Sequence, residues 1–188
     1  MVPRGRPRDT GVEAKVLDAA MAEMRARGYD GMSVDRVAER AGVAKTTIYR
    51  RWPSKAELVM AMITELTSAV PFDPTGDPRH DLGEFVAGIA AALDAIPTTL
   101  VADLVAAAAR EPRVGVGVRE LWAHRHAAVS AAIAQAQVDG QLPAYADPRI
   151  LVDQLVGALY YRLLVTGEPI DPAYVRALVL STLGPEQS

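Results

Sequence analysis

The sequence predicts an all-α protein. Half of its 188 residues are hydrophobic but only 5% are aromatic, so the core must consist mainly of Ala, Val and Leu, which favours close helix packing over a sheet. Apolar residues recur at helical spacing along most of the chain, and Pro or Gly separates the periodic segments. The Asp-Pro pairs at 147–148 and 171–172 each place an N-cap before a proline, which is typical of a helix start.

Two helices are predicted between residues 10 and 42. The first begins at a capping box, Thr10-Gly-Val-Glu13, continues with apolar residues at helical spacing and ends at Gly28. Ser33 is the predicted N-cap of a second, short helix over 34–40. Gly42 then closes that helix, and a tight turn follows.

Two more helices are predicted before residue 71. The third covers 44–50 and ends at Trp52-Pro53, because proline disfavours helical geometry in the residue before it. We expect Trp52 to be a wedge in the core or between domains rather than a base-stacking residue. A second capping box, Ser54-Lys-Ala-Glu57, starts the fourth helix, which runs to about residue 70.

A segment rich in Pro, Gly and Asp, PFDPTGDP at 71–78, marks the predicted domain boundary, because neither helix nor strand persists in such a composition. It divides the chain into a basic arm at 1–9, a first domain at 10–70 and a second domain at 79–188. Further helices are predicted in the second domain at 80–95, 98–110, 113–138, 148–166 and 172–183.

The charge of the chain is unevenly distributed. The net charge is −3, yet residues 1–55 contain 12 Lys and Arg against 7 Asp and Glu, and the remaining residues contain 8 against 16. Binding of a polyanion needs positive charge at one place rather than on the whole protein. The basic N-terminal part is therefore compatible with nucleic-acid binding.

Two short helices joined by a turn at Gly42, the second of them polar and basic, form a helix-turn-helix pattern, in which the second helix enters a DNA major groove. Ala38 permits close approach of the helices, and apolar residues on both fix their angle. The predicted outward-facing residues are Ala44, Lys45, Thr46, Thr47, Tyr49 and Arg50.

Different side chains of this segment suit different parts of DNA. Lys45 and Thr46 are the best candidates for base edges. Hydroxyl and guanidinium groups donate to phosphate oxygens, so Thr47, Tyr49 and Arg51 are expected at the backbone. The ring of Tyr49 can also pack under the fourth helix while its hydroxyl reaches a phosphate.

Two other groups of positive charge point to the same partner. Lys55 lies in the first turn of the fourth helix, where free backbone N–H groups and the helix dipole favour an anion, so we expect it to clamp a phosphate. Arg4, Arg6 and Arg8 form a narrow basic arm suited to a minor groove. The alternative for this arm is a disordered tail with no bound state.

The segments Ser33-Val-Asp-Arg-Val-Ala-Glu-Arg-Ala-Gly-Val and Ala44-Lys-Thr-Thr-Ile-Tyr-Arg-Arg-Trp-Pro-Ser-Lys-Ala-Glu-Leu58, with the helix before them, resemble the DNA-binding domain of TetR-family transcriptional regulators. The resemblance covers roughly residues 10 to 60 and is looser beyond residue 80. It implies that Tyr49 and Lys55 contact phosphates, that residues 44–47 face bases, and that Ser33 contacts the DNA backbone.

The resemblance also implies a fold of about nine helices, with a C-terminal domain for ligand binding and dimerisation. A homodimer is expected through 148–166 and 172–183, and a ligand cavity among the middle helices. The candidate ligand-binding residues are Trp122, His126, Asp153 and Tyr160. Asp153, Tyr160 and Tyr161 either orient a ligand or lie at the dimer interface, and Gly157-Ala158 suits close approach of two helices.

The sequence favours no catalytic, cofactor or metal site. It has no cysteine, which excludes disulfides and thiolate metal sites and is compatible with a cytoplasmic location. His124 and His126 point to different faces of one helix, so they cannot chelate one metal. Gly115-Val-Gly117 lacks the third glycine and the preceding strand of a dinucleotide-binding loop. No signal peptide or membrane span is predicted.

These features leave three functional hypotheses. The first is a dimeric regulator, most often a repressor in this family, that a small apolar ligand releases from a palindromic operator. The second is an architectural DNA-binding protein with no effector, which a filled core without a cavity would favour. The third is an enzyme built on a helical bundle, and it ranks last because no nucleophile–base pair or pair of carboxylates is recognised in the sequence.

Overall fold

A computed structural model describes residues 10–184, and this part of the chain is helical with no strand. It contains nine α-helices and one π-helical turn, which confirms the predicted all-α class. The elements are α1 (Thr10–Gly31), α2 (Val34–Ala41), α3 (Lys45–Arg51), α4 (Lys55–Ser68), α5 (Pro78–Asp94), α6 (Thr98–Arg110), α7 (Pro112–Val138), α8 (Pro148–Tyr161), η1 (Arg162–Thr166) and α9 (Pro172–Leu183).

The helix starts follow from their caps. Asp147 and Asp171 each accept a hydrogen bond from a backbone N–H of the first turn, and a proline occupies the first helical position. Asp77 and Pro78 form the same arrangement at the start of α5. This helix therefore begins two residues before the predicted 80–95 segment.

Two helix ends and one start differ from the prediction. Gly28 (φ 65°, ψ −179°) interrupts α1 rather than ending it, and a further short helical stretch reaches Gly31. Regular α-helix in the predicted 148–166 segment stops at Tyr161, after which a π-helical turn leads to left-handed Gly167 (φ 68°). Ala44 has an extended conformation and is the N-cap of α3 instead of its first residue.

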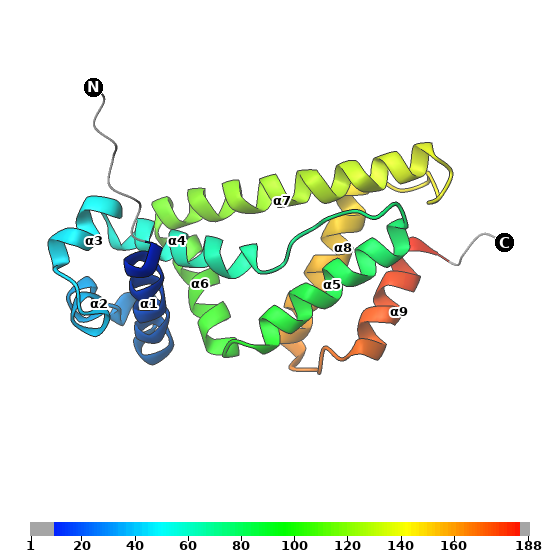
Figure 1. Cartoon of the computed structure of the whole chain (residues 1–188). Helices are drawn as coiled ribbons and strands as arrows, with labels where there is room; N and C mark the ends of the chain where they lie inside the picture. The colour runs from blue at the N-terminus through cyan, green and yellow to red at the C-terminus, as the bar shows by residue number, and fades with distance from the viewer. Residues whose placement is uncertain (1–9, 185–188) are drawn as a thin grey trace, which may run out of the picture.

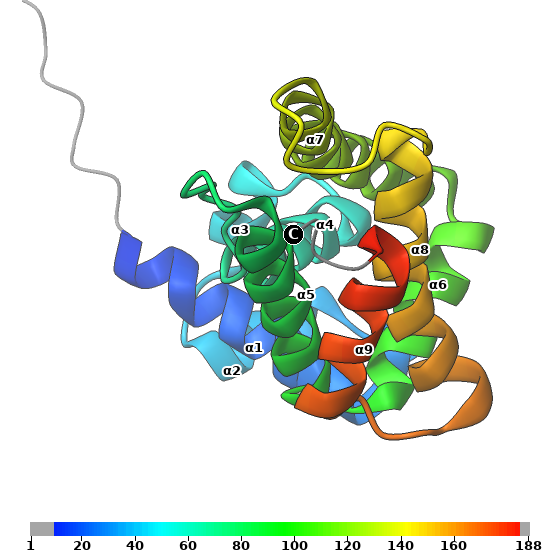
Figure 2. The same ribbon diagram turned by 90° about the vertical axis from the view of Figure 1, so that its right-hand side faces the viewer.

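The helices form two groups joined by long elements (Figure 1). Helices α1 to α3 lie at one end, α5, α8 and α9 lie at the other, and α7 runs along one side from the first group to the second. In the end-on view, α9 lies beside both α5 and α8 (Figure 2), and these pairs are in contact. Helix α4 leads from the first group towards the second.

The hydrophobic interior consists of two clusters that do not coincide with the predicted domain boundary. The N-terminal cluster contains buried residues of α1 to α4, but Leu100, Ala107 and Val114 from α6 and α7 belong to it as well. The C-terminal cluster is formed mainly by α5 and α7 to α9. The division at 71–78 separates segments of the chain, whereas in the fold α6 packs against α1 and α7 packs against α4.

The two glycines of the Gly115-Val-Gly117 segment are positions of close helix approach. A Cβ on Gly115 would lie 2.4 Å from the carbonyl oxygen of Ala108 on α6. A Cβ on Gly117 would lie 2.9 Å from the side chain of Met60 on α4. These glycines therefore let α7 pack tightly against both neighbours.

Within residues 10–184 no single helix combines the length and the apolar character needed to cross a membrane. Helices α5 and α6 meet these criteria only as a pair, and they are bent by 101° at their junction.

Candidate DNA-binding surface and ligand cavity

Helices α2 and α3 form a compact helix-turn-helix. Gly42 adopts the left-handed conformation (φ 66°, ψ 34°), and the N–H of Val43 donates to the carbonyl of Ala38 at 3.0 Å, so the turn between the helices is tight. Val37 and Ile48 are almost completely buried. Burial of an apolar side chain on each helix fixes the angle between them.

The opposite face of α3 is open to solvent. Ala44, Lys45, Thr46, Tyr49 and Arg50 are exposed, whereas Thr47 is half-buried. The residues predicted to face DNA thus lie on one side of the helix, with the Thr47 hydroxyl at its edge. Trp52 is buried in the N-terminal cluster beside them, as expected for a wedge rather than a stacking residue.

Two of the three charges on α3 are paired within the protein. The ammonium of Lys45 forms an ion pair with Asp35 of α2 and lies 5.6 Å from the centre of the Tyr49 ring. The hydrogen bond to Asp35 raises the pKa of Lys45. Arg51 forms an ion pair with Glu13 of α1 and lies over the Trp52 ring, whereas Arg50 has no ion pair with any described residue. Exposed pairs of this kind are weak and can exchange for phosphate.

Lys55 and Ser33 have partners of their own. The Lys55 ammonium donates to the carbonyl of Tyr29 at 2.9 Å and lies 4.4 Å from the centre of that ring. The Ser33 hydroxyl accepts from the N–H of Asp35 at 3.3 Å and so caps α2. Lys55 thus links the start of α4 to the end of α1, and Ser33 stabilises the start of α2; any contact with DNA is in addition to these roles. Arg4, Arg6 and Arg8 lie outside the described residues.

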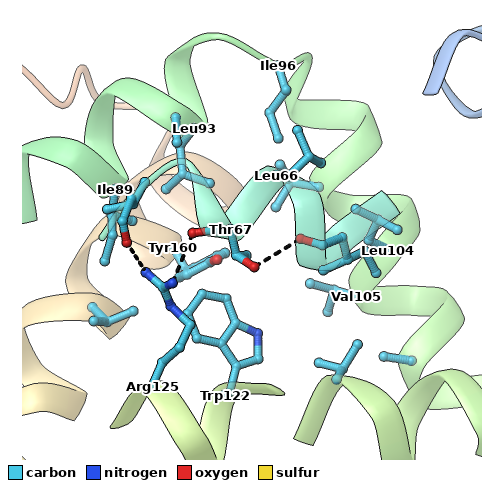
Figure 3. Close-up of a pocket in the computed structure, with 17 residues that line it drawn as sticks. Leu66, Thr67, Ile89, Leu93, Ile96, Leu104, Val105, Trp122, Arg125 and Tyr160 are labelled. Atoms are coloured by element: carbon cyan, nitrogen blue, oxygen red, sulfur yellow. Dashed lines mark hydrogen bonds between the residues drawn. The ribbon is translucent and has the colours of Figure 1, made fainter. Parts of the chain in front are cut away.

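A cavity of about 410 Å³ is enclosed by residues of five helices, α4, α5, α6, α7 and α8, and its volume is within the size range of small-molecule sites. Its wall is almost wholly apolar, and the polar side chains at it are Thr67, Trp122, Arg125 and Tyr160 (Figure 3). The lining residues are Ile63, Leu66, Thr67, Val70, Ile89, Ala92, Leu93, Ile96, Val101, Leu104, Val105, Ala108, Val118, Trp122, Arg125, Val156 and Tyr160.

Arg125 is the only charged residue among those that line the cavity. Its Nη1 and Nη2 atoms donate to the carbonyls of Thr67 at 2.9 Å and of Val70 at 2.7 Å (Figure 3). Burial lowers the pKa of Arg125, while the nearby Tyr160 phenol acts in the opposite direction. Burial likewise raises the pKa of Tyr160, and Arg125 opposes that effect. The guanidinium nevertheless stays protonated at neutral pH, because an arginine side chain does not lose its proton in this range.

The structure brings two of the four candidate ligand-binding residues to this cavity. The rings of Trp122 and Tyr160 meet edge to face with their centres 6.3 Å apart. His126 and Asp153 lie outside it and contact each other instead, with Nε2 and Oδ1 3.1 Å apart. Of the two adjacent tyrosines, Tyr160 faces the cavity and Tyr161 is 58% exposed, because consecutive residues of a helix point in different directions.

His126 also lies 3.2 Å from the hydroxyl of Ser130, so that Ser, His and Asp follow one another in a hydrogen-bonded row. A nucleophilic serine must be accessible and needs nearby N–H donors for the oxyanion. Ser130 is buried at 8% exposure in the middle of α7, where the backbone N–H groups are bonded within the helix, while Asp153 is exposed. This row links α7 to α8, but it offers neither an accessible serine nor free N–H donors for an oxyanion, which a hydrolytic site needs.

Reasoning from the sequence did not assign Arg125 or Thr67 to the cavity. A signal for Arg125 was present, since it lies three residues after Trp122 and therefore on the same helix face. That this face meets the end of α4 follows only from the tertiary packing. Thr67 carries no comparable signal.

The helix-turn-helix unit, followed by a helical domain with an apolar cavity, defines a class of two-domain DNA-binding regulators. Comparison with known proteins specifies the family. A sequence model described as "Bacterial regulatory proteins, tetR family" matches residues 16–62, and one described as "Tetracyclin repressor-like, C-terminal domain" matches residues 72–181. The chain belongs to the TetR family of transcription regulators, which are DNA-binding proteins and generally not enzymes.

Three similar proteins span nearly the whole chain. The uncharacterized HTH-type transcriptional regulator YdeS of Bacillus subtilis (strain 168) is 31% identical over 95% of this chain and 91% of its own length. The DNA-binding transcriptional repressor TetR of Mycobacteroides abscessus is 32% identical over 95% of this chain and 93% of its own. The crystal structure of the TetR family transcription regulator SCO0332 superposes with a TM-score of 0.72 and 34% identity, covering 92% of this chain and 96% of that one.

Proposed function

We propose that this protein is a cytoplasmic, homodimeric repressor that binds a palindromic operator and leaves it when a small, largely apolar ligand occupies the cavity. The name of the Mycobacteroides abscessus relative, a transcriptional repressor, supports the direction of regulation. The size and the apolar wall of the cavity support a ligand of this kind. They also count against an architectural protein without an effector, for which a filled core is expected.

The observation that carries the proposal is the position of α4. Only three residues separate the end of α3 from Lys55, the first residue of α4, and the second half of α4 supplies Ile63, Leu66 and Thr67 to the cavity wall. One rigid element thus connects the ligand site to the recognition helix. A ligand that binds two positions of α4 unequally shifts the population between them. In a dimer, that shift changes the spacing of the two recognition helices, which must match half-sites about 34 Å apart or a multiple of it.

The DNA contacts we propose follow the exposed face of α3. Lys45 and Thr46 read base edges, while Thr47, Tyr49 and Arg51 bind phosphates. Lys55 and Ser33 lie at the neighbouring helix starts and add backbone contacts. Arg50, which has no ion pair within the described chain, completes the basic surface, and the arm with Arg4, Arg6 and Arg8 enters the minor groove.

The dimer we propose forms through α8 and α9. On α8, Ile150, Gly157 and Tyr161 are exposed at positions i, i+7 and i+11, which places them on one face. Leu180 on the neighbouring α9 is 56% exposed. A Cβ on Gly157 would meet no atom within 4 Å, so the protomer itself does not require glycine there. Close approach of a second copy provides a reason for it.

Selection of binding sites from random duplex DNA at two salt concentrations tests the proposal. We expect an inverted repeat to be enriched, because a symmetric dimer recognises two equivalent half-sites. The recovered operator then serves to screen small molecules for release. Salt-sensitive binding without enrichment of any sequence would support the architectural alternative instead.

A further inference from the structure

The cavity contains a half-buried positive charge that has no negative partner among the described residues. Among the described residues, no carboxylate oxygen lies within 4.0 Å of a nitrogen of Arg125. The guanidinium is surrounded by apolar side chains and lies 5.9 Å from the ring of Phe85 and 6.0 Å from that of Trp122. Removing a charge from water is unfavourable unless a counter-charge compensates it.

The hydrogen bonds of Arg125 satisfy only part of the guanidinium. Nη1 and Nη2 donate to neutral backbone carbonyls, whereas Nε is buried and has no hydrogen-bond partner. A buried N–H without a partner is destabilising by about 1–3 kcal/mol. A carboxylate can accept from Nε and one Nη at the same time, and this bidentate pair is both shorter and stronger than bonds to carbonyls.

The two carbonyls that Arg125 holds belong to the end of α4. Thr67 lies in the last turn of that helix and Val70 just after it, and α4 has no basic residue of its own in its last turn. Arg125 therefore supplies from α7 the positive charge that stabilises the C-terminal end of a helix. The same side chain contacts the cavity and secures the helix that leads to the DNA-binding unit.

We propose that the effector is an apolar acid: a molecule with one carboxylate on an apolar body, whose carboxylate pairs with Arg125 while the body fills the cavity. This inference rests on the ligand-responsive function proposed above and specifies the ligand class. Tyr160 provides a second donor at the same wall, because its hydroxyl has no hydrogen bond with any described residue. Pairing with the ligand draws the guanidinium away from Thr67 and Val70, which loosens the end of α4 and favours release of DNA.

Matched ligands test the ligand class directly. We would measure calorimetric binding of octanoate, octanol and octylamine, and of phenylbutyrate, phenylbutanol and phenylbutylamine, at neutral pH. Each set keeps the apolar body and changes only the head group. We expect each acid to bind about 10- to 100-fold more tightly than its alcohol, as for a hydrogen bond to a charged group, and the amines to bind most weakly.

Variants of Arg125 test the assignment of the residue. Arg125→Gln is expected to remove the preference for the acid, and Arg125→Lys to retain part of it, because Lys keeps the charge but not the bidentate geometry. Arg119→Gln changes an exposed arginine of the same helix and is expected to leave the preference unchanged. If Arg125→Gln does not fold, a reduced preference for the acid in Arg125→Lys, together with the head-group series on wild type, still tests whether Arg125 binds the carboxylate.

Release of the selected operator, measured in the same samples, separates this inference from the proposed function. Acids that bind and release DNA support both. If the alcohols bind and release DNA as well as the acids do, the acid-specific site is refuted and the ligand-responsive repressor stands. If no compound of either set binds while the protein still binds its operator, the inference about the cavity is refuted and DNA binding is unaffected.

Discussion

At the scale of single residues, Lys55 combines a structural contact with a position suited to DNA. Its ammonium donates to the carbonyl of Tyr29, which ties the start of α4 to the end of α1. The ammonium also donates to the carbonyl of Asp30 at 3.5 Å, so one of its three donors remains for a phosphate. Lys45 differs, since its partner is the exposed carboxylate of Asp35. On DNA, an acceptor atom of a base edge can take the place of this carboxylate as the partner of the ammonium.

Substitution of the two lysines should therefore give different results. Lys55→Ala is expected to weaken binding to all DNA sequences alike, to lower the salt slope by about 1 and to cost about 1 kcal/mol of stability through the lost bond to Tyr29. Lys45→Ala is expected to change the preference between operator sequences. Binding isotherms on cognate and mutated operators at several salt concentrations measure both effects. Identical behaviour of the two variants would show that the division of roles is wrong.

Asp81 contributes to the dependence of folding stability on pH in the acid range. Burial by itself would raise the pKa of this carboxyl, but hydrogen bonds from the N–H and hydroxyl of Thr75 and from the N–H of Gly76, with nearby His80, lower it below its ordinary 3.8. A lowered pKa in the folded state gives stability that is complete above the unfolded-state pKa and is lost as pH falls through the folded-state pKa.

We expect Asp81→Asn to be less stable than wild type at neutral pH, with the difference narrowing as the pH falls below 3.8. Urea unfolding over a pH series measures this. Asp73→Asn, which changes an exposed carboxylate on the same segment, is the control and should follow wild type. A difference between Asp81→Asn and wild type that stays constant through the acid range would contradict the role given to the carboxylate.

At the scale of helices, the close packing of α7 against α6 requires a glycine at position 115. A methyl group at Gly115 would lie 2.4 Å from the backbone oxygen of Ala108, so one of the two helices must move. We expect Gly115→Ala to destabilise the protein by about 1–3 kcal/mol despite the higher helix propensity of alanine.

Gly83→Ala in α5 is the matched control. A Cβ there would meet no atom within 4 Å, so this variant is expected to gain up to about 1 kcal/mol from helix propensity alone. Thermal unfolding of both variants distinguishes packing from propensity. Stabilisation of both would mean that α6 and α7 do not approach closely at Gly115.

The sequence signals predict helices better than the contacts between them. Asp-Pro pairs and capping boxes are local, so most helix starts were predicted within two residues. The π-helical turn after Tyr161 was missed because the apolar pattern continues to residue 166 without a break. The carbonyl partners of Arg125 are 55 and 58 residues away in the chain, and no local pattern predicts such a contact.

At the scale of the whole molecule, the two hydrophobic clusters share helix α6. Leu100 and Ala107 of α6 pack in the N-terminal cluster, while Val101 of the same helix packs in the C-terminal one. Leu104 and Ala108 pack against the N-terminal cluster and also line the cavity. The proposed ligand, by moving α6 or α4, would thus change the packing of the DNA-binding unit without contacting it.

In the proposed dimer such a movement would change operator affinity, and dimerisation can be tested separately from DNA binding. We expect Leu180→Glu and Gly157→Glu to yield monomers, because a second copy would bury the introduced charge without a partner. Val138→Glu, on an 80% exposed residue at the end of α7, is the control and should remain dimeric. Molar mass by light scattering and operator binding would be measured on the same preparations.

Both interface variants should fold as wild type does, since Gly157 and Leu180 are exposed in the protomer. Operator affinity should fall because one recognition helix alone contacts half the site, and the second half-site no longer benefits from the high effective concentration that linkage provides. A wild-type molar mass of one chain would contradict the proposed dimer. Dimers that persist in both variants would place the dimer interface elsewhere. Monomers that bind the full operator undiminished would instead show that α8 and α9 join two copies without coupling their recognition helices.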